Sequence, residues 1–257
     1  MGSGECAVII RYQGLSKTAR IISPFTAPQK GDLEQAAKGN PIDKLVLGKV
    51  FALGLEPSPI ASHSDFLRRV YLDTIGLKPT VDETRKFLSD TDPQKREKLI
   101  DELLSRPEFV DFWALKWGDI LKSTRNILTE KGMNSLHIWL RKSVAENKPW
   151  NQFARELLLS QGSTFEEGPA NYYRAANGAN ELAEMTSQVF LGVRMQCAKC
   201  HNHPYEKWTQ NQYYQMAAFF ARVRTKPGKT NDDRHVFLAR NGDVSNPRTK
   251  KIAVPTA

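Results

Sequence analysis

Cysteine is scarce in this chain of 257 residues, which contains three cysteines and five histidines. Three cysteines cannot form a framework of paired disulfides, so the fold must depend on a hydrophobic core. No apolar run approaches the roughly 20 residues that a membrane-spanning helix needs. The opening residues also lack the basic start and apolar stretch of a secretory signal peptide. The sequence therefore excludes a disulfide scaffold and predicts no transmembrane segment.

The charge balance is basic, with 37 lysine and arginine residues against 28 aspartate and glutamate residues. The basic residues are spread along the chain and are densest near its end, at 222–226 and 248–251. They are not interleaved with aromatic residues as in known nucleic-acid modules, so we expect no nucleic-acid partner. A surplus of lysine is ordinary for a soluble protein, but it also suits an acidic protein partner.

The first 27 residues have a β pattern that the following residues lack. Two β-rich runs, 6–12 and 18–23, flank a segment at 13–17 that can turn the chain, and together they predict a β-hairpin. An isolated hairpin is barely stable in water, so we interpret residues 1–27 as the last strands of a larger β domain. Residues 28–40 contain proline and glycine and are predicted to be a linker.

The pattern becomes helical at residue 41 and stays so to about residue 225, which predicts a mainly α fold of several helices. Apolar residues at helical spacing and caps such as the Thr80–Glu83 capping box mark these helices. Helices are predicted at 41–52, 64–75, 80–88, 93–105, 108–124, 133–147, 150–161, 180–193 and 209–223.

Two other segments have weaker patterns. Residues 163–179 are rich in glycine, asparagine and aromatic residues, and are predicted to be a long loop that could cover a site. Residues 226–257 are predicted to be a partly irregular extension with a little β structure. In that extension we expect a strand at 235–240 and a hairpin turn at Asn241–Gly242.

The segment Cys197-Ala-Lys-Cys200-His201 carries the most specific chemical pattern. Two cysteines separated by two residues and followed by histidine are typical of covalent haem attachment. On a helical turn, this spacing places both thiols along one porphyrin edge, where they can add to its two vinyl groups. His201 then lies beneath the ring and can coordinate the iron. We therefore predict one haem c held by Cys197, Cys200 and His201.

A structural zinc site is the main alternative, because Cys197, Cys200, His201 and His203 are four potential ligands within seven residues. Adjacent Cys200 and His201 would converge awkwardly on one tetrahedral ion, and His235 is only a distant further candidate. A pair of reduced thiols or a local disulfide is another alternative. A thioredoxin-like pair is disfavoured because a helix, not a strand, precedes the motif.

The motif does not identify a sixth ligand for the iron. Candidates are Met185, Met195, Met216, His203 and His235. A methionine or histidine there would favour electron transfer, whereas an open position would allow small ligands to bind. A methionine on a helix face more often packs in the core, so none of these is assigned.

Three stretches, 65–80, 98–109 and 190–205, resemble the planctomycete cytochrome c domain family known as DUF1549 or PSCyt2. The last stretch contains the cysteine motif and His203. Residues 7–24 resemble the final strands of a bacterial Ig-like domain. The resemblance implies an exported protein, periplasmic or at the cell surface, with haem at Cys197, Cys200 and His201. We expect its signal sequence to lie outside this stretch of chain.

These observations predict a c-type cytochrome-like module for one-electron transfer. Its partner would be a redox protein or an adjacent domain, and the basic charge would favour an acidic one. The alternative is a structural or interaction module that binds zinc through Cys197, Cys200 and His201 or His203. The acidic residues are scattered without a catalytic pair, so we favour a module over a stand-alone enzyme. A role beside an enzyme acting on extracellular polymers has no residue to support it.

Overall fold

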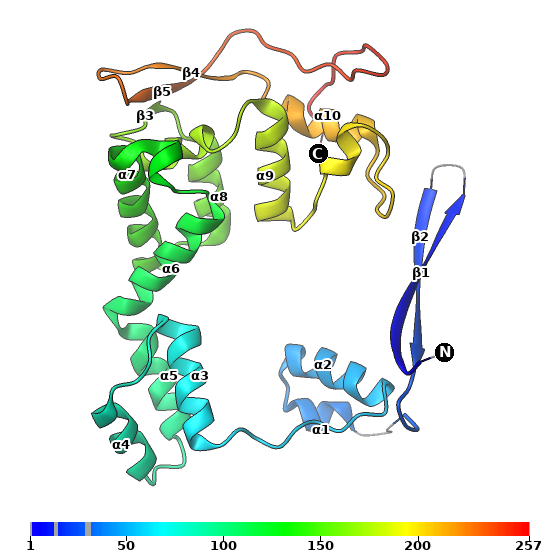
Figure 1. The fold of residues 1–257 in the computed structure, drawn as a ribbon, viewed down its shortest axis with the longest axis vertical. Coiled ribbons are helices and arrows are strands. Elements are labelled where there is room, and N and C mark those ends of the chain that lie inside the picture. The colour runs from blue at the N-terminus through cyan, green and yellow to red at the C-terminus, as the bar shows by residue number, and fades with distance from the viewer. Residues whose placement is uncertain (1, 13–14, 29–31, 257) are drawn as a thin grey trace. The chain divides into compact units, whose positions relative to one another are not determined.

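The computed structural model describes residues 2–12, 15–28 and 32–256. Its described residues are mainly α-helical, with a two-stranded sheet near the N-terminus and a three-stranded sheet later in the chain, which confirms the predicted fold class (Figure 1). Internal contacts divide the chain into two compact units. One contains residues 1–61 with 202–207, and the other contains residues 62–201 with 208–257.

The first unit begins with the predicted hairpin. Strands β1 (Gly4–Tyr12) and β2 (Leu15–Ser23) pair antiparallel, and Cys6 lies opposite Ile21. The centre of the predicted turn, residues 13–14, lies outside the described residues. Side chains on both faces of the hairpin are exposed, including those of Ile10 and Ile22. The hairpin therefore has no buried face among the residues that the structure describes.

Two helices follow in the same unit, α1 (Leu33–Ala37) and α2 (Pro41–Ala52). Helix α2 was predicted, and the side chain of Asn40 caps it. Helix α1 lies within residues 28–40, which were predicted to be a linker. The Asp32 carboxylate accepts the backbone N–H groups of Glu34 and Gln35, which supplies the N-cap that stabilises this single turn.

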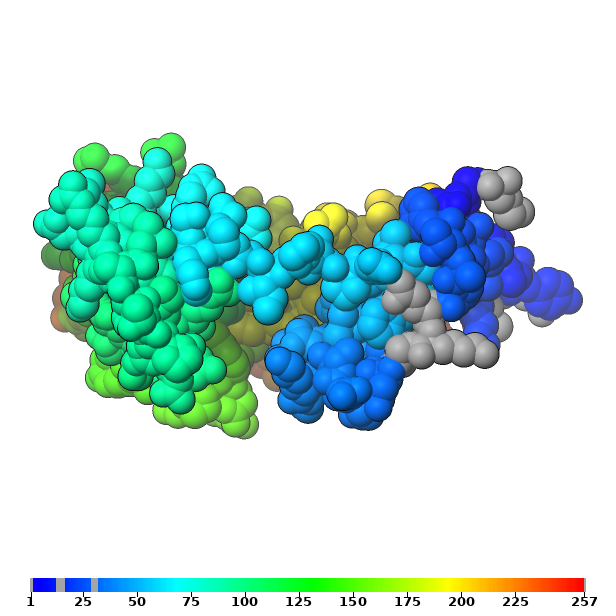
Figure 2. Space-filling view, turned by 90° about the horizontal axis from the view of Figure 1, so that it is seen from below, coloured from blue at the N-terminus to red at the C-terminus, as the bar shows by residue number. Residues whose placement is uncertain are grey.

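The second unit starts with three helices around a small core. They are α3 (His63–Ile75), α4 (Val81–Ser89) and α5 (Lys95–Ser105). Their buried apolar side chains are Leu67, Tyr71, Ile75, Phe87, Leu99 and Leu103. The outer face of these helices, coloured cyan to green, forms a continuous surface in the space-filling view (Figure 2).

A polar network stabilises one side of this small core. The Glu83 carboxylate accepts hydrogen bonds from the backbone N–H of Thr80 (2.7 Å) and from the Arg106 guanidinium (2.8 Å). Arg106 also donates to Glu108 (2.6 Å). Burial acts to raise the pKa of Glu83, but the hydrogen bonds from Thr80 and Arg106 outweigh it and lower that pKa to about 2. The carboxylate is therefore stabilised in its charged, folded environment.

Acidification should weaken this part of the fold. A depressed folded-state pKa adds stability above the ordinary value of 4.5, and that stability is lost as the pH falls from there toward 2. Allowing for partial exposure, we expect a contribution of about 2 kcal/mol at neutral pH. Urea unfolding gives the free energy of unfolding at pH 7 and at pH 3. The decrease between the two pH values should be smaller in Glu83→Gln than in the unaltered chain. Glu130→Gln, at a side chain that is 73% exposed, should leave this decrease unchanged.

The next helices along the chain pack in a larger core and in a third, smaller cluster. They are α6 (Pro107–Ile120), α7 (Arg125–Ala145), α8 (Trp150–Leu159), the 3₁₀ helix η1 (Gly168–Arg174), α9 (Ala179–Leu191), the 3₁₀ helix η2 (Gln196–Lys199) and α10 (Gln210–Ala218). The fully buried side chains of the larger core include Leu128, Leu136, Leu140, Phe153, Leu157 and Tyr172. The smaller cluster contains Ala198 of η2 with Met195, Tyr213 and Tyr214. Among the described residues, every helix is too short or too polar to span a bilayer.

Two predictions for this core are wrong. Helix α7 begins at Arg125, eight residues before the predicted start at 133, and the non-helical backbone of Thr129 (φ 62°, ψ 169°) divides it into a short first turn and a longer helix. The predicted loop at 163–179 contains η1, whose residues from Gly168 to Tyr173 are buried. Asn171 donates to the carbonyls of Thr164 and Gly168, so this polar segment has internal hydrogen-bond partners and packs as core.

A small sheet follows, with strand order β3-β5-β4. It contains β3 (Gly162–Ser163), β4 (Val223–Pro227) and β5 (Arg234–Leu238), paired antiparallel. The predicted strand near 235 is confirmed. The predicted hairpin turn at 241–242 is wrong, because β5 pairs with the preceding strand β4, which had been assigned in part to the last helix.

Candidate functional site

The cysteine motif lies on a short 3₁₀ turn after α9. Gly192 ends α9 in the left-handed region (φ 66°), where its N–H donates to the Ser187 carbonyl, and the chain then leads into η2. Cys197 lies within η2, and Cys200 is its C-terminal cap residue. His201 follows directly.

The two sides of this turn have opposite environments. A 3₁₀ helix has three residues per turn, so side chains three apart lie one above the other. Met195 and Ala198 form one such pair, and they are only 4% and 0% exposed. Cys197 and Cys200 form the other pair, and both thiols are free and exposed. The buried pair therefore anchors the turn, and the thiols share its outer side.

Helix α10 fixes the backbone at the end of the turn. Its N-cap is the Thr209–Gln212 capping box. In its first turn, the buried amide of Gln210 donates to the carbonyls of Lys199 (3.0 Å) and Cys200 (3.1 Å). The Tyr214 hydroxyl also donates to the Lys199 carbonyl, at 3.1 Å. These bonds hold the peptide groups immediately before His201.

Two neighbouring tyrosines pack against the buried side of the turn, and each hydroxyl donates a hydrogen bond. Tyr213 is fully buried and donates to the Glu184 carboxylate at 2.6 Å. Burial, followed by the hydrogen bond to Glu184, raises the pKa of Tyr213. Burial also raises the pKa of Tyr214, with a further contribution from the nearby Cys200. Both phenols therefore stay protonated at neutral pH, and Tyr214 keeps its role as a donor.

The candidate sixth ligands have other surroundings. Met195 is buried, and its sulfur accepts a hydrogen bond from the Ser187 hydroxyl at 3.2 Å. Met185 is buried in the larger core. Met216 is partly buried and packs against that core. His235 lies on β5, opposite Ser163 and Lys226.

His203 belongs to the first unit, in the segment 202–207. Its Nδ1 accepts the backbone N–H groups of Tyr205 (3.2 Å) and Glu206 (3.0 Å). This local turn holds the His203 ring by one nitrogen. Because the lone pair of Nδ1 is engaged in this way, a metal could bind His203 only through Nε2.

The donor set around the turn fits covalent haem. Thioether formation needs two accessible thiols on one side of the chain, and Cys197 and Cys200 provide them. A zinc site needs at least three gathered ligands, and within the described ranges no three histidine, cysteine, aspartate or glutamate side chains gather in this way. Cys197, Cys200 and His201 would hold the haem, with Gln210 and Tyr214 as supporting residues that the sequence analysis missed. The Thr209–Gln212 capping pattern was the available signal, because it places Gln210 in the first turn of a helix.

Comparison with known families gives one match. The family model PSCyt2, described as a protein of unknown function (DUF1549), matches residues 41–225. No curated protein and no solved structure matches the chain.

Proposed function

Because this chain belongs to the PSCyt2 (DUF1549) family, whose match includes the cysteine motif, we propose that it is a c-type cytochrome-like module for one-electron transfer. Cys197 and Cys200 would each form a thioether, and His201 would be the proximal iron ligand. The observation that carries the proposal is the pair of exposed thiols on one side of η2, directly followed by His201.

The residues around the motif would position and insulate the cofactor. The hydrogen bonds from Gln210 and Tyr214 hold the carbonyls of Lys199 and Cys200, which limits how the His201 backbone can move. Bound haem supplies the one-electron chemistry, and burial and hydrogen bonding around its ligand set the reduction potential. The sixth ligand is left unassigned because the three methionine candidates pack in the cores.

The proposed haem attachment also bears on the location of the protein and on its partner. We propose an exported protein, since covalent haem attachment takes place on exported chains. Its partner would be a redox protein or neighbouring domain with an acidic surface, which the formal net charge of +9 would attract. Such steering weakens with salt, because ions screen exposed charges over about 10 Å at 0.1 M.

A visible spectrum combined with denaturing mass analysis tests the proposal. The chain should be exported in a host that carries cytochrome c maturation proteins. We expect sharp absorption bands on reduction and a mass that retains one haem after denaturation, because thioether bonds survive unfolding. A folded, colourless protein with one zinc per chain would contradict this and support the zinc alternative.

A further inference from the structure

The end of the chain forms a strap, residues 244–256, which packs against the turn that carries the cysteine motif. Val244 and Ala253 of the strap pack against the small apolar cluster that includes η2. The buried amide of Asn246 donates to the Asn211 side chain on α10 at 2.6 Å, and Figure 1 shows this end of the chain beside that helix. The strap is therefore fixed next to the motif.

Five exposed cations belong to the strap and to the segment that contains the motif. They are Arg194, Lys199, Arg248, Lys250 and Lys251. Tyr214 connects the two groups, because its hydroxyl donates to the Lys199 carbonyl and it lines a cavity of about 290 Å³ together with Lys251. Within the part of the chain that the structure describes, no carboxylate forms an ion pair with any of the five cations.

Carboxylates are scarce in the elements that surround these cations. Residues 190–218 and 243–256 together contain six basic and two acidic residues, whereas the whole chain has 37 basic and 28 acidic residues. The neighbouring helix α9 contains two glutamates. Glu184 accepts a hydrogen bond from a buried tyrosine hydroxyl, and Glu181, near the opposite end of α9 from the motif, accepts a backbone N–H. The positive surplus is therefore greater here than in the chain as a whole.

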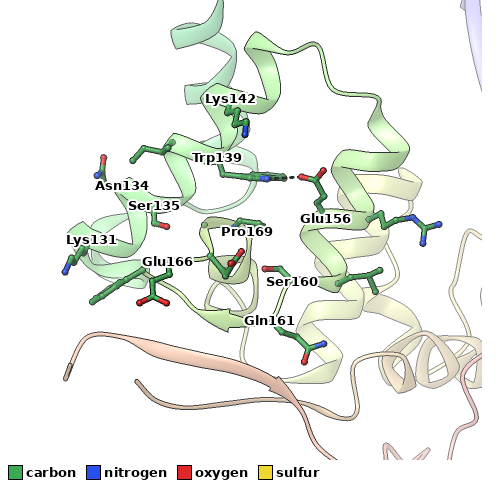
Figure 3. Close-up of a pocket in the computed structure, with 16 residues that line it drawn as sticks. Lys131, Asn134, Ser135, Trp139, Lys142, Glu156, Ser160, Gln161, Glu166 and Pro169 are labelled. Carbon is green, nitrogen blue, oxygen red and sulfur yellow. Dashed lines mark hydrogen bonds between the residues drawn. The ribbon is translucent and has the colours of Figure 1, made fainter. Parts of the chain in front are cut away.

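Other parts of the surface are balanced in charge. The groove between α7 and α8, which residues 160–169 also line, is an example (Figure 3). Its charged lining residues are three cations and three carboxylates: Lys131, Lys142, Arg155, Glu156, Glu166 and Glu167. An acidic partner therefore has no electrostatic reason to prefer that groove, but it has one to prefer the strap.

Apolar side chains are also exposed beside the cations. Ile252 and Val254 on the strap are 60% and 68% exposed, and Leu191, the last residue of α9, is 60% exposed. One such residue is ordinary on a protein surface. Protein interfaces combine apolar contacts with a charged rim, so three of these residues beside unpaired cations suit a protein partner better than a small anion.

We propose that an acidic protein docks on the strap and the adjoining motif turn, with Arg248, Lys250 and Lys251 as its main charged contacts. This inference rests on the proposed function, because a redox partner has to come close to the haem, and the strap is a basic surface beside the attachment turn. Charge complementarity of this kind acts mainly on the association rate and on its salt dependence. The cations beside the turn should therefore matter more than equal charges elsewhere on the protein.

Peptide binding to the whole chain, with or without haem, tests the position of this surface. The probe is a fluorescent 16-residue peptide of alternating glutamate and serine. We expect saturable binding in about 10 mM salt that weakens as salt is added, because screening shortens the reach of the charges. Arg248→Glu/Lys251→Glu should weaken binding at least fivefold, and Arg248→Gln/Lys251→Gln by a smaller factor. Both side chains are exposed, so the fold should be retained, which circular dichroism checks.

Arg68→Glu/Arg69→Glu is the matched control, since it makes the same change in net charge at two exposed arginines of α3. It should change the affinity less than twofold. Equal losses in the two charge-reversed variants, or no binding of the peptide, would overturn the proposal. So would binding of the chain to vesicles with about 30% phosphatidylglycerol when it does not bind the peptide, because the surface would then suit a membrane.

Electron transfer by the haem-loaded chain separates this inference from the proposed function. Ferricyanide, an anion, and tris(phenanthroline)cobalt(III), a cation of equal charge, each take one electron from the reduced protein. The reversal at positions 248 and 251 should slow the reaction with ferricyanide at least fivefold and accelerate the reaction with the cobalt complex, whereas the control should change either rate less than twofold. If haem attaches but both variants respond alike, the docking surface is wrong and the cytochrome function stands. If no haem attaches, the cytochrome function fails, and the peptide result still decides whether the surface binds an acidic partner.

Discussion

Replacing both Cys197 and Cys200 with alanine should abolish covalent haem attachment. No thioether can form without a thiol, so the denatured double variant should have the mass of the bare polypeptide. Because both side chains are exposed and Met195 and Ala198 anchor the turn, the fold should be retained. We expect the free energy of unfolding of the haem-free chains to change by less than about 0.5 kcal/mol. Denaturing mass spectrometry and urea unfolding measure the two effects.

Cys6→Ala is the matched control for this prediction. Cys6 is also free and exposed, but it lies on β1 and outside the motif. Its substitution should leave the haem content unchanged, and each single variant at Cys197 or Cys200 should retain at most one thioether. If the double variant kept a haem that survives denaturation, the attachment site would have to be elsewhere in the chain.

Gly168→Ala should be among the most destabilising single-methyl changes in this protein. Gly168 is buried where η1 crosses α7, and a Cβ there would lie 2.5 Å from the Ser135 carbonyl oxygen and 3.0 Å from the Trp139 Cβ. The backbone of α7 would have to move, because neither contact can be relieved by rotating a side chain. We expect a loss of about 3 kcal/mol in the free energy of unfolding, measured by urea denaturation.

Gly118→Ala provides the opposite case in the same unit. Gly118 is also buried, inside α6, but a Cβ there would meet only the Ser123 Cβ at 3.6 Å and Leu140 at 4.0 Å, which are ordinary contacts. Alanine also reduces the freedom of the unfolded chain, so we expect an unchanged or slightly higher stability, by about 0.5 kcal/mol. If both variants lost similar amounts of stability, the short distance from position 168 to the Ser135 carbonyl oxygen would not be the cause of the loss in Gly168→Ala.

Local patterns account for most of what could be predicted of the fold. The β-rich runs around residues 13–17 predicted the hairpin, and the Thr80–Glu83 capping box predicted the start of α4. These features depend on residues within a few positions of one another. The same holds for the motif, whose spacing alone brings Cys197 and Cys200 to one side of a turn.

The errors concern residues whose structure depends on distant partners. Strand β3 consists of Gly162 and Ser163, and it exists because β5, more than 70 residues later, pairs with it. The glycine- and asparagine-rich segment around η1 is typical of a loop, but its buried amide at Asn171 finds carbonyl partners within the fold. No window of local sequence contains that information. Likewise, only the folded position of α10 brings Gln210 to the Lys199 carbonyl.

The strand β5 also has a consequence for where this protein can be divided. The family match ends at residue 225, yet Val236 on β5 is only 1% exposed in the larger core. Just before it, Asp233 accepts hydrogen bonds from the hydroxyls of Ser163 (2.9 Å) and Thr164 (3.1 Å). The end of the family match therefore falls inside a packed region, which continues at least to Val236. A chain shortened to end at residue 225 would therefore lose the buried side chain of Val236 and the hydrogen bonds of Asp233, and would leave part of the larger core uncovered.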